Sequence, residues 1–382
     1  MDERLGPLDL LVVQPTPFCN LDCSYCYLPD RGSRARMGPE TLSRVFERVA
    51  ESGLARRPYT VVWHAGEPLV LPPAWYEEAF ATAGRFALPG AEVTHSFQTN
   101  ATLIDAAWCA LFRRHGVRVG VSVDGPAFLH DARRRTRAGK GTHARVVDGI
   151  GWLRREGVPF HAITVLTREA LDYPDELHDF YRDAGIETVG FNVEEIEGPN
   201  TGSSLSAGDA ERRYRAFMDR FFDLAMGGEP QLRVREFGST IGAVLHGGGE
   251  RPLASQEATP FAIVSVGVGG DFSTFSPELL GLSGHPFGDF SIGNVHRDSF
   301  AVAAASPRYE ALSKEVLSGV DRCAARCAHF RFCGGGAPAN KFFENGSFDS
   351  TETLFCRLHR KALADVVLQK MRRPRARSAR AG

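Results

Sequence analysis

The sequence has no hydrophobic run long enough to cross a membrane and almost no net charge. No stretch approaches the roughly eighteen consecutive apolar residues of a membrane-spanning helix. The 45 lysines and arginines nearly balance the 46 aspartates and glutamates, which leaves a formal charge of −1. No global field therefore favours binding to nucleic acid or to an anionic membrane. We expect neither partner.

Other absences concern targeting and disulfides. Residues 1–4 lead almost directly into the apolar run Leu10–Val13, which leaves no room for a signal peptide. No internal repeat of roughly 20–50 residues is present. Seven of the eight cysteines fall into two groups, a pattern that favours metal binding in a reducing compartment over disulfide bonds. We therefore expect a cytoplasmic protein.

The first cysteine group follows the apolar run Leu10–Val13, which reads as a buried strand. Its members, Cys19, Cys23 and Cys26, have the spacing C-x3-C-x2-C. A [4Fe–4S] cluster normally takes four thiolates, so three on one loop leave an iron open to a small molecule. Half a zinc site is an alternative, but no further Cys or His follows until His64. A thioredoxin-like pair would leave one cysteine without a role.

This spacing resembles the signature of the radical S-adenosylmethionine (SAM) superfamily. The resemblance implies that the open iron binds the amino and carboxylate groups of SAM. It also implies that reductive cleavage of SAM yields methionine and a 5′-deoxyadenosyl radical. Tyr25 occupies the position at which the family places an aromatic residue beside the adenine.

Strand and helix patterns alternate through the first half of the chain. Strands are expected at 10–13, 60–64, 93–98, 117–123, 160–165 and 188–192, and helices at 41–55, 73–86, 105–115, 144–156, 172–184 and 205–225. This alternation predicts a parallel α/β sheet with right-handed crossovers. Periodicity alone also permits a doubly wound sheet. The family resemblance favours a partial (β/α)6 TIM-like radical SAM barrel that is open on one side.

Polar motifs follow the second, third and fourth predicted strands, where a parallel sheet gathers its functional groups. The stretch 64–68 is similar to the family's GGEP motif, with Ala65 in place of the first glycine. The resemblance implies that Gly66 and Glu67 bind the SAM amino group. Asn100, Ser122 and Asp124 match positions that reach the SAM ribose and methionyl portion.

An arginine-rich segment, 133–137, resembles the part of the family that binds the SAM carboxylate, and we assign this role to Arg134. Each of these motifs has a simpler interpretation. Gly66-Glu67-Pro68 and Asp124-Gly125-Pro126 are ordinary turn sequences. The arginines also suit a solvated helix start. Their joint placement at successive strand ends, behind three cysteines, favours cofactor binding.

The second cysteine group contains Cys323, Cys327, Cys333 and Cys356. It resembles the SPASM domain, a C-terminal module with auxiliary iron–sulfur clusters in peptide-modifying radical SAM enzymes. Ala337 stands where the family has a further cysteine, and residues 261–282 contain none. The resemblance therefore implies one auxiliary [4Fe–4S] cluster with four thiolate ligands. A four-cysteine zinc site is the alternative.

We divide the chain into a radical SAM core (8–226), a bridging region with a SPASM-like domain (227–370) and a disordered basic tail (371–382). Met226-Gly227-Gly228 marks the junction, and Gly247-Gly248-Gly249 a later loop. The second half is expected to contain fewer regular helices, because its periodic apolar patterns are weaker.

Residues 272–279, 334–348 and 351–353 resemble those of cyclophane-forming maturases, including the type that acts on glycine-rich-repeat precursors. The resemblance implies a carbon–carbon crosslink between an aromatic side chain and a nearby residue of a ribosomally made precursor peptide. An external low-potential electron donor is then required. Restoring aromaticity releases a proton, for which Glu278 is the candidate base, with Asp271 behind it. Either carboxylate is also a typical surface charge in a turn.

Other functions remain open from the sequence. Within radical chemistry they are thioether formation, epimerisation and formylglycine formation in a sulfatase. A non-catalytic iron–sulfur electron carrier is the alternative from another class. The SAM-type motifs between Gly66 and Arg137 favour an enzyme, because a carrier has no use for them.

Overall fold

The computed structural model describes residues 5–246 and 255–372, and a curved ten-stranded sheet forms its centre. The strand order is β12-β9-β8-β1-β2-β3-β4-β5-β6-β7. The strands are β1 (Leu10–Val13), β2 (Tyr59–Trp63), β3 (Val93–Thr99), β4 (Arg118–Ser122), β5 (Phe160–Leu166), β6 (Thr188–Val193), β7 (Arg233–Val234), β8 (Ile263–Val266), β9 (Asp271–Thr274) and β12 (Gly293–Asn294). Neighbours from β8 to β7 run parallel, whereas β9 and β12 add antiparallel strands at one edge.

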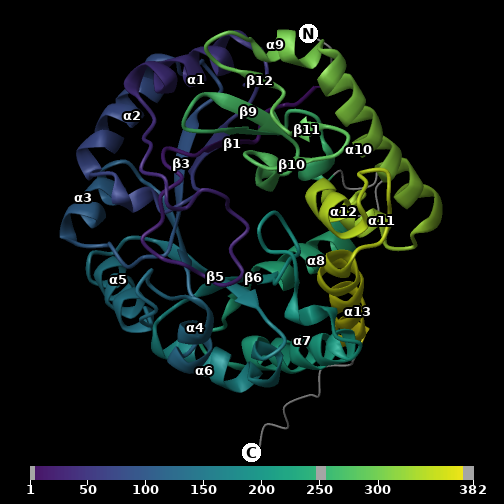
Figure 1. The fold of residues 1–382 in the computed structure, drawn as a ribbon. Helices are drawn as coiled ribbons and strands as arrows, with labels where there is room; N and C mark the ends of the chain where they lie inside the picture. The colour runs from purple at the N-terminus through teal and green to yellow at the C-terminus, as the bar shows by residue number, and fades with distance from the viewer. Residues whose placement is uncertain (1–4, 247–254, 373–382) are drawn as a thin grey trace, which may run out of the picture.

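Helices surround this sheet (Figure 1). Those of the first half are α1 (Pro39–Glu51), α2 (Pro73–Arg85), α3 (Ala106–Arg114), α4 (Ala127–Arg133), α5 (His143–Arg155), α6 (Pro174–Asp183) and α7 (Ala210–Gly227). Those of the second half are α8 (Arg235–His246), α9 (Phe300–Ala304), α10 (Pro307–Arg326), α11 (Phe330–Cys333), α12 (Pro338–Asn345) and α13 (Leu363–Arg372). A π-helical segment, Cys356–Ala362, leads into α13, and β10 (Ser283–Gly284) pairs with β11 (Gly288–Asp289) as a separate hairpin.

The predicted parallel α/β architecture is confirmed. All six predicted strands form within a few residues of their expected bounds, and they lie side by side in chain order. A doubly wound sheet would reverse its direction of winding at a switch point. The order from β1 to β6 has no such reversal, so these strands build an open barrel wall.

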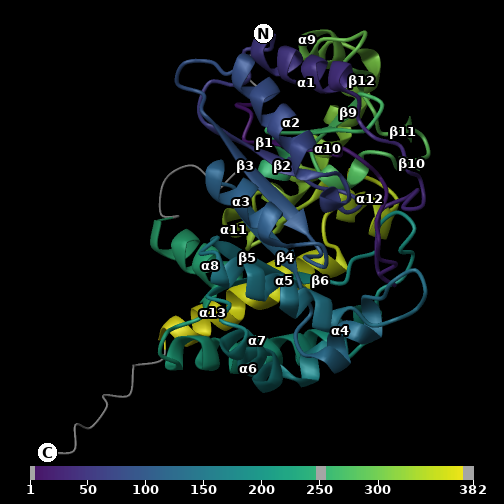
Figure 2. The same ribbon diagram turned by 90° about the vertical axis from the view of Figure 1, so that its left-hand side faces the viewer.

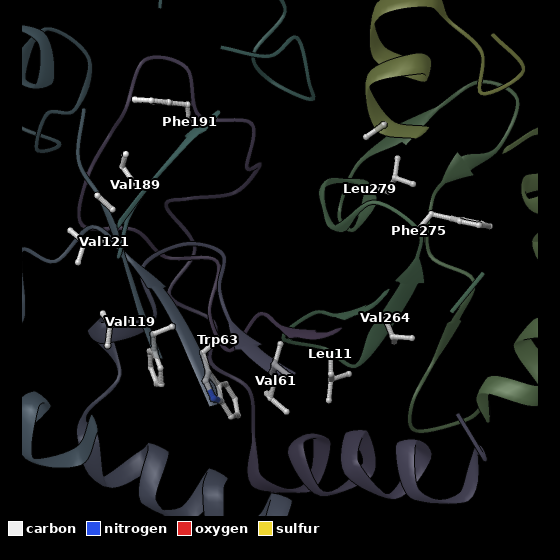
Figure 3. Close-up of a cluster of buried hydrophobic side chains, with 14 of the residues drawn as sticks. Leu11, Val61, Trp63, Val119, Val121, Val189, Phe191, Val264, Phe275 and Leu279 are labelled. Carbon is white, nitrogen blue, oxygen red and sulfur yellow. The ribbon is translucent and has the colours of Figure 1, made fainter. Parts of the chain in front are cut away.

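The strands alternate between an apolar outer face and an inner face that borders a cavity. In β2, Tyr59, Val61 and Trp63 are buried, whereas Val62 points to the cavity side. Figure 3 shows Val61 and Trp63 within a buried apolar cluster that also contains Leu11 of β1. Packing of this face against the helices fixes the strand ends, because buried side chains interlock closely.

The second half contains extensive regular helix, which its weak apolar patterns did not predict. Helix α10 has 20 residues, and its buried residues Leu312 and Val316 lie four apart along one face. Helix α13 packs against α7 and α8, as Figure 2 shows. The C-terminal segment is thus anchored on the barrel helices. The predicted helix 205–225 begins later, at Ala210, because Ser204–Ser206 forms a separate 3-10 turn.

The sheet crosses the predicted boundary at residue 226. Strand β7 pairs with β6, and β8 pairs with β1, so the second half supplies strands to both sides of the six-stranded wall. The division into 8–226, 227–370 and 371–382 stays a prediction. Gly247-Gly248-Gly249 and residues 373–382 lie outside the described residues, while Met371 and Arg372 belong to α13.

Within the described residues, none of the helices combines the length and the apolar character required to span a bilayer.

Gly149 of α5 lies where a side chain would strike the loop that follows β3. A Cβ atom at this position would lie 2.2 Å from the carbonyl oxygen of Ala101. Replacing glycine by alanine inside a helix normally stabilises it by about 0.5–1 kcal/mol. We predict instead that Gly149→Ala destabilises the protein by roughly 1–3 kcal/mol, the range for an overpacked core.

Gly84 of α2 is the matched control, because nothing lies within 4 Å of its Cβ position. Gly84→Ala should leave the stability unchanged or raise it by up to about 1 kcal/mol. Urea unfolding of both variants and of the parent protein measures the difference. Equal effects of the two substitutions would contradict the close approach of α5.

Candidate active site

The three N-terminal cysteines lie at the mouth of a cavity of about 380 Å³ formed at the carboxyl ends of the strands. Cys19, Cys23 and Cys26 are all partly exposed to it. The wall consists of polar and apolar side chains from five consecutive strands and the residues that directly follow them: Val62 and His64, Gln98, Thr99 and Asn100, Ser122, Ile163 and Val165, and Asn192, Val193 and Glu194. This volume is within the range of small-molecule sites, roughly 300–1,000 Å³.

The cysteine loop is held by backbone pairing with the arginine-rich segment. The amide of Asp22 donates to the carbonyl of Arg135 at 2.7 Å, and the amide of Ser24 donates to that of Arg133 at 3.0 Å. The Arg137 side chain donates to the Cys19 carbonyl at 2.9 Å. Three of the crowded arginines therefore support the loop, which leaves Arg134 as the one that lines the cavity.

Arg134 forms a buried ion pair with Asp124 at the end of β4. Its Nε and Nη2 atoms donate to the two Asp124 oxygens at 2.9 and 3.1 Å. The Tyr25 hydroxyl donates to the same carboxylate, and the Val165 amide donates to it at 3.0 Å. The guanidinium also lies 5.4 Å from the centre of the Tyr25 ring. Arg134 holds the pKa of Asp124 below its usual range, although burial opposes this.

Asp124 lies behind the cavity wall, and its predicted contact with SAM stays a prediction. It does not line the cavity, and its two oxygens accept four hydrogen bonds from the chain itself. A carboxylate has about four lone-pair sites, so this one is saturated. Its position instead fixes Tyr25 and Arg134, which do line the cavity.

Glu67 also uses its oxygens to hold the strand ends together. The carboxylate accepts hydrogen bonds from the backbone N–H of Leu69 at 3.0 Å, the Thr99 hydroxyl at 2.7 Å and the backbone N–H of Asn100 at 2.8 Å. Burial raises its pKa to about 7, although these donors favour the ionised form. Glu67 lines the cavity, and three of its four lone-pair sites are taken.

Gly66 is required by the close approach of the cysteine loop. Ala65 and Gly66 have φ angles of +70° and +58°, a conformation that glycine adopts without strain. A Cβ on Gly66 would lie 2.5 Å from the Phe18 carbonyl oxygen and 2.7 Å from that of Thr16. The glycine therefore lets the loop after β2 lie directly against the start of the cysteine loop.

Most predicted SAM-site residues do come together. Besides the three cysteines, the cavity is lined by Tyr25, Gly66, Glu67, Asn100, Ser122, Arg134 and Glu278. Asp271 does not belong to this group. It is exposed at the start of β9, and its carboxylate accepts a hydrogen bond from the Asn294 amide at 2.9 Å. Asp271 therefore does not line this cavity, and its role behind Glu278 stays a prediction.

A second cavity of about 420 Å³ adjoins the first one. Both are lined by Asn192, Glu195, Glu197, Arg235 and Glu278. The second is also bordered by α8, α12 and the segment around α13, through Ser239, Asn340 and His359 among others. The chain therefore provides two adjoining spaces, one beside the cysteine loop and one beside the C-terminal region.

Besides Glu236, the second cavity is lined by four carboxylates, Glu195, Glu197, Glu257 and Glu278, and all of these four except Glu257 also line the first cavity. The Asn340 amide donates to Glu195 at 2.7 Å and to Glu197 at 3.2 Å. Burial raises the pKa of Glu195 to about 7 and that of Glu197 well above its usual value. Burial, then repulsion by Glu257 and Glu195, raises the pKa of Glu278 to about 8.

Sequence reasoning missed Glu197, Glu257 and Asn340 in this cluster. Glu195 follows the sixth predicted strand, and Glu197 lies two residues further on. Glu257 and Asn340 are far from it in the sequence and carry no local pattern that points to the site. His64 begins the stretch 64–68, and the sequence assigned no role to its side chain. It lines the first cavity, and burial lowers its pKa to about 4, so it is neutral there.

The residues fit an open-iron cluster and a zwitterionic cofactor. Burial raises the pKa of the Cys19 thiol to about 12 and that of Cys23 to about 11, so a bound metal cation would be required to hold them as thiolates. His64 lines the cavity, and its buried Nδ1 atom has no hydrogen-bond partner among the described residues. Arg134 adds a guanidinium suited to a carboxylate.

The C-terminal cysteines are close enough to influence one another electrostatically. Cys323 lies near the end of α10 and Cys327 follows that helix, whereas Cys333 ends α11 and Cys356 begins the π-helical segment. Burial, then repulsion by Cys333, raises the pKa of the Cys356 thiol to about 12. Four thiols from three elements thus face one another.

The two cysteine groups differ from a preformed single-ion site. Across residues 5–246 and 255–372, no three His, Cys, Asp or Glu side chains converge on a point that could hold one metal ion. Tetrahedral zinc requires its sulfur ligands at about 2.3 Å from one point. A cubane cluster instead takes each thiolate on a different iron atom.

Comparisons with known proteins agree with this geometry. Residues 13–195 match the model of the radical SAM superfamily. The chain is 44% identical over 369 residues to the uncharacterized protein sll1766 of Synechocystis sp., an alignment that covers 96% of this chain and 92% of that protein. It is 33% identical over 205 residues to the serine-type anaerobic sulfatase-maturating enzyme of Klebsiella aerogenes, covering 53% and 51% of the two chains.

Two solved structures share the fold. Native anSMEcpe with bound AdoMet aligns with a TM-score of 0.77 and 19% identity, over 95% of this chain and 98% of that one. SuiB of Streptococcus suis bound to the precursor peptide SuiA aligns with a TM-score of 0.65 and 17% identity, over 92% and 76% of the two chains. At these identities the similarity shows the fold alone.

We predict that Asp124→Asn destabilises the protein by about 3–5 kcal/mol, because Arg134 would then be a buried charge without its partner. Iron bound by the N-terminal cysteines should fall in parallel, since the loop loses its anchor. Urea unfolding and iron content per chain measure the two effects. Tyr25→Phe is the control, because it removes one hydroxyl and should cost only about 1 kcal/mol. Parent-like stability of Asp124→Asn would disprove the anchoring role.

Proposed function

We propose that the chain, whose residues 13–195 match the radical SAM superfamily, matures a ribosomally made precursor peptide by a carbon–carbon crosslink. The bond joins an aromatic side chain to a nearby residue and forms a cyclophane. One observation carries this proposal: the cavity beside the three cysteines adjoins a second, carboxylate-lined cavity, and Glu278 borders both. Cofactor and peptide would therefore meet beside a proton acceptor.

The first cavity would hold the cofactors. Cys19, Cys23 and Cys26 would bind a [4Fe–4S] cluster, and Arg134 and the loop at Gly66 would orient SAM on its open iron. Bound together, these cofactors supply a 5′-deoxyadenosyl radical, which takes a hydrogen atom from an unactivated carbon. The buried walls formed by the strands limit the access of water to this chemistry.

The crosslink removes two hydrogens from the peptide. One leaves as the abstracted hydrogen atom. After the carbon radical has added to the ring, the other leaves as a proton and an electron. Glu278 would accept the proton, and its raised pKa makes it a stronger base than an ordinary carboxylate. Glu195 and Glu197, which lie at the same junction of the cavities, would share the accepted proton with Glu278.

The electron would leave through the C-terminal module. We propose that Cys323, Cys327, Cys333 and Cys356 saturate one auxiliary [4Fe–4S] cluster. Four thiolates leave no open iron, so this cluster is suited to electron transfer and not to SAM binding. An external low-potential donor would reduce the N-terminal cluster. The module would correspond to residues 227–370, behind a core at 8–226.

Formylglycine formation is the second candidate. It is favoured by the 33% identity to the sulfatase-maturating enzyme of Klebsiella aerogenes, although that alignment covers about half of each chain. Thioether formation and epimerisation are further radical modifications. An electron carrier without catalysis is less consistent with a cavity that combines the three cysteines with Arg134 and Asn100.

The proposed activity is tested by anaerobic reconstitution and by co-expression with the precursor peptide encoded beside the gene. With SAM and dithionite, the protein should release 5′-deoxyadenosine, and the variant with Cys19, Cys23 and Cys26 changed to Ala should release none. The peptide should lose two hydrogens, and fragmentation should locate a carbon–carbon bond at an aromatic ring. A crosslink through a sulfur atom would contradict the cyclophane and support thioether formation. An aldehyde derived from a serine would contradict it and support formylglycine formation.

Glu278→Gln should abolish crosslinking and still permit formation of 5′-deoxyadenosine, because the amide cannot accept the ring proton. In the parent protein only the carboxylate form is active, so the crosslinking rate should rise with pH up to about 8 and then level off. Mass spectrometry of the peptide across pH 6–9, a range of about three units around that pKa, measures the profile.

Glu257→Gln is the matched control. Glu257 repels the Glu278 carboxylate and contributes to its raised pKa. Its neutralisation should keep the activity and move the pH profile to lower pH. A profile that stays in place, together with full activity of Glu278→Gln, would exclude Glu278 as the base.

A further inference from the structure

Helix α12 places a buried lysine against the C-terminal cysteines. The side chain of Lys341 is enclosed, with the residue only 3% exposed. Its ammonium lies beside the Cys323 sulfur and interacts electrostatically with Cys323, Cys333 and Cys356. We propose that Lys341 is the fixed counter-charge of the auxiliary cluster and raises its reduction potential. This inference rests on the auxiliary cluster of the proposed function.

The surrounding backbone is shaped to admit this side chain. Gly319 lies in the middle of α10, where glycine normally costs a helix about 1 kcal/mol relative to alanine. A Cβ there would lie 2.2 Å from the Phe348 carbonyl oxygen and 3.1 Å from the Lys341 ammonium. The same point lies 3.2 Å from the Ser350 carbonyl oxygen. The missing side chain therefore makes room for the lysine and for the loop beside it.

Lys341 has no carboxylate partner that would account for its burial. Among the described residues, none of its contacts is an ion pair with Asp or Glu at 4.0 Å or less. The nearby acid Asp349 is already paired with Arg322 at 2.6 Å and accepts from Ser318 at 2.8 Å. A buried ammonium is costly unless it is paired. The thiolates of the cysteine group are the anionic partners that this position offers.

The charge of the lysine acts differently on the two oxidation states. When the cluster accepts the one electron released by the crosslinked ring, its iron is reduced and its charge becomes one unit more negative. The ring proton goes to Glu278 in the same overall step. A buried ammonium stabilises the more negative state more strongly, because interactions between charges are strong in a low-dielectric interior. Lys341 would thereby favour transfer of the electron to the cluster.

Lys361 provides a matched comparison. It also interacts electrostatically with Cys356 and Cys327. However, its side chain is 28% exposed and forms an ion pair with Glu352. Solvent and the carboxylate both screen its charge, so its effect on the cluster should be much smaller than that of Lys341.

The experiment uses the full chain with Cys19, Cys23 and Cys26 changed to Ala, so that only the C-terminal cluster remains. In this background Lys341→Met, Lys341→Gln, Lys341→Arg and Lys361→Met are compared by redox titration monitored by electron paramagnetic resonance. Both neutral Lys341 variants should shift the midpoint potential to more negative values. Lys341→Arg should stay close to the parent, and Lys361→Met should shift it less than Lys341→Met does.

Iron and sulfide content separate the two levels of the proposal. Four irons per chain with an unchanged potential in Lys341→Met and Lys341→Gln would overturn the role of Lys341 and leave the auxiliary cluster in place. A parent background that binds no iron–sulfur cluster would overturn the auxiliary cluster itself, and this inference with it. An equal shift in Lys341→Arg and Lys341→Met would show that packing, and not charge, sets the potential.

Discussion

The position of the N-terminal cysteine loop depends on one buried carboxylate, Asp124. It joins the end of β4 to Arg134, to the Tyr25 hydroxyl within the cysteine loop and to the backbone of β5. A loop without regular secondary structure has little rigidity of its own. The hydrogen bonds of Asp124 connect the loop to the sheet and thereby make the loop rigid, because a saturated buried ion pair tolerates little displacement of its partners.

The carboxylates around the two cavities separate into groups with different functions. The carboxylate oxygens of Asp124 and Glu67 accept hydrogen bonds from donors within the chain, and these bonds hold strand ends together. Glu278 and Glu197 are buried with fewer donors and lie close to other acids, so their pKa values rise. The same residue type thus provides structure at one edge of the site and proton-accepting capacity at the other.

The local pattern of the chain was sufficient to predict the six central strands, the helix over 105–115 and the cysteines that face the cavity. It also predicted most of the cavity wall, because residues that follow parallel strands meet at one edge. It failed where a role depends on which group lies opposite. Asp271 lies away from the cavity, and Glu257 reaches it from a segment without a recognisable motif.

The sequence alone determined the chemistry of the site: three cysteines at one spacing, polar residues behind successive strands and four further cysteines near the end of the chain. Only the tertiary structure decided that Asp124 forms an ion pair with Arg134, that two cavities adjoin at Glu278 and that Lys341 lies against Cys323. The physical reason is that periodicity and spacing report on neighbours along the chain. Charge pairing and burial are set instead by segments that folding brings together from distant positions.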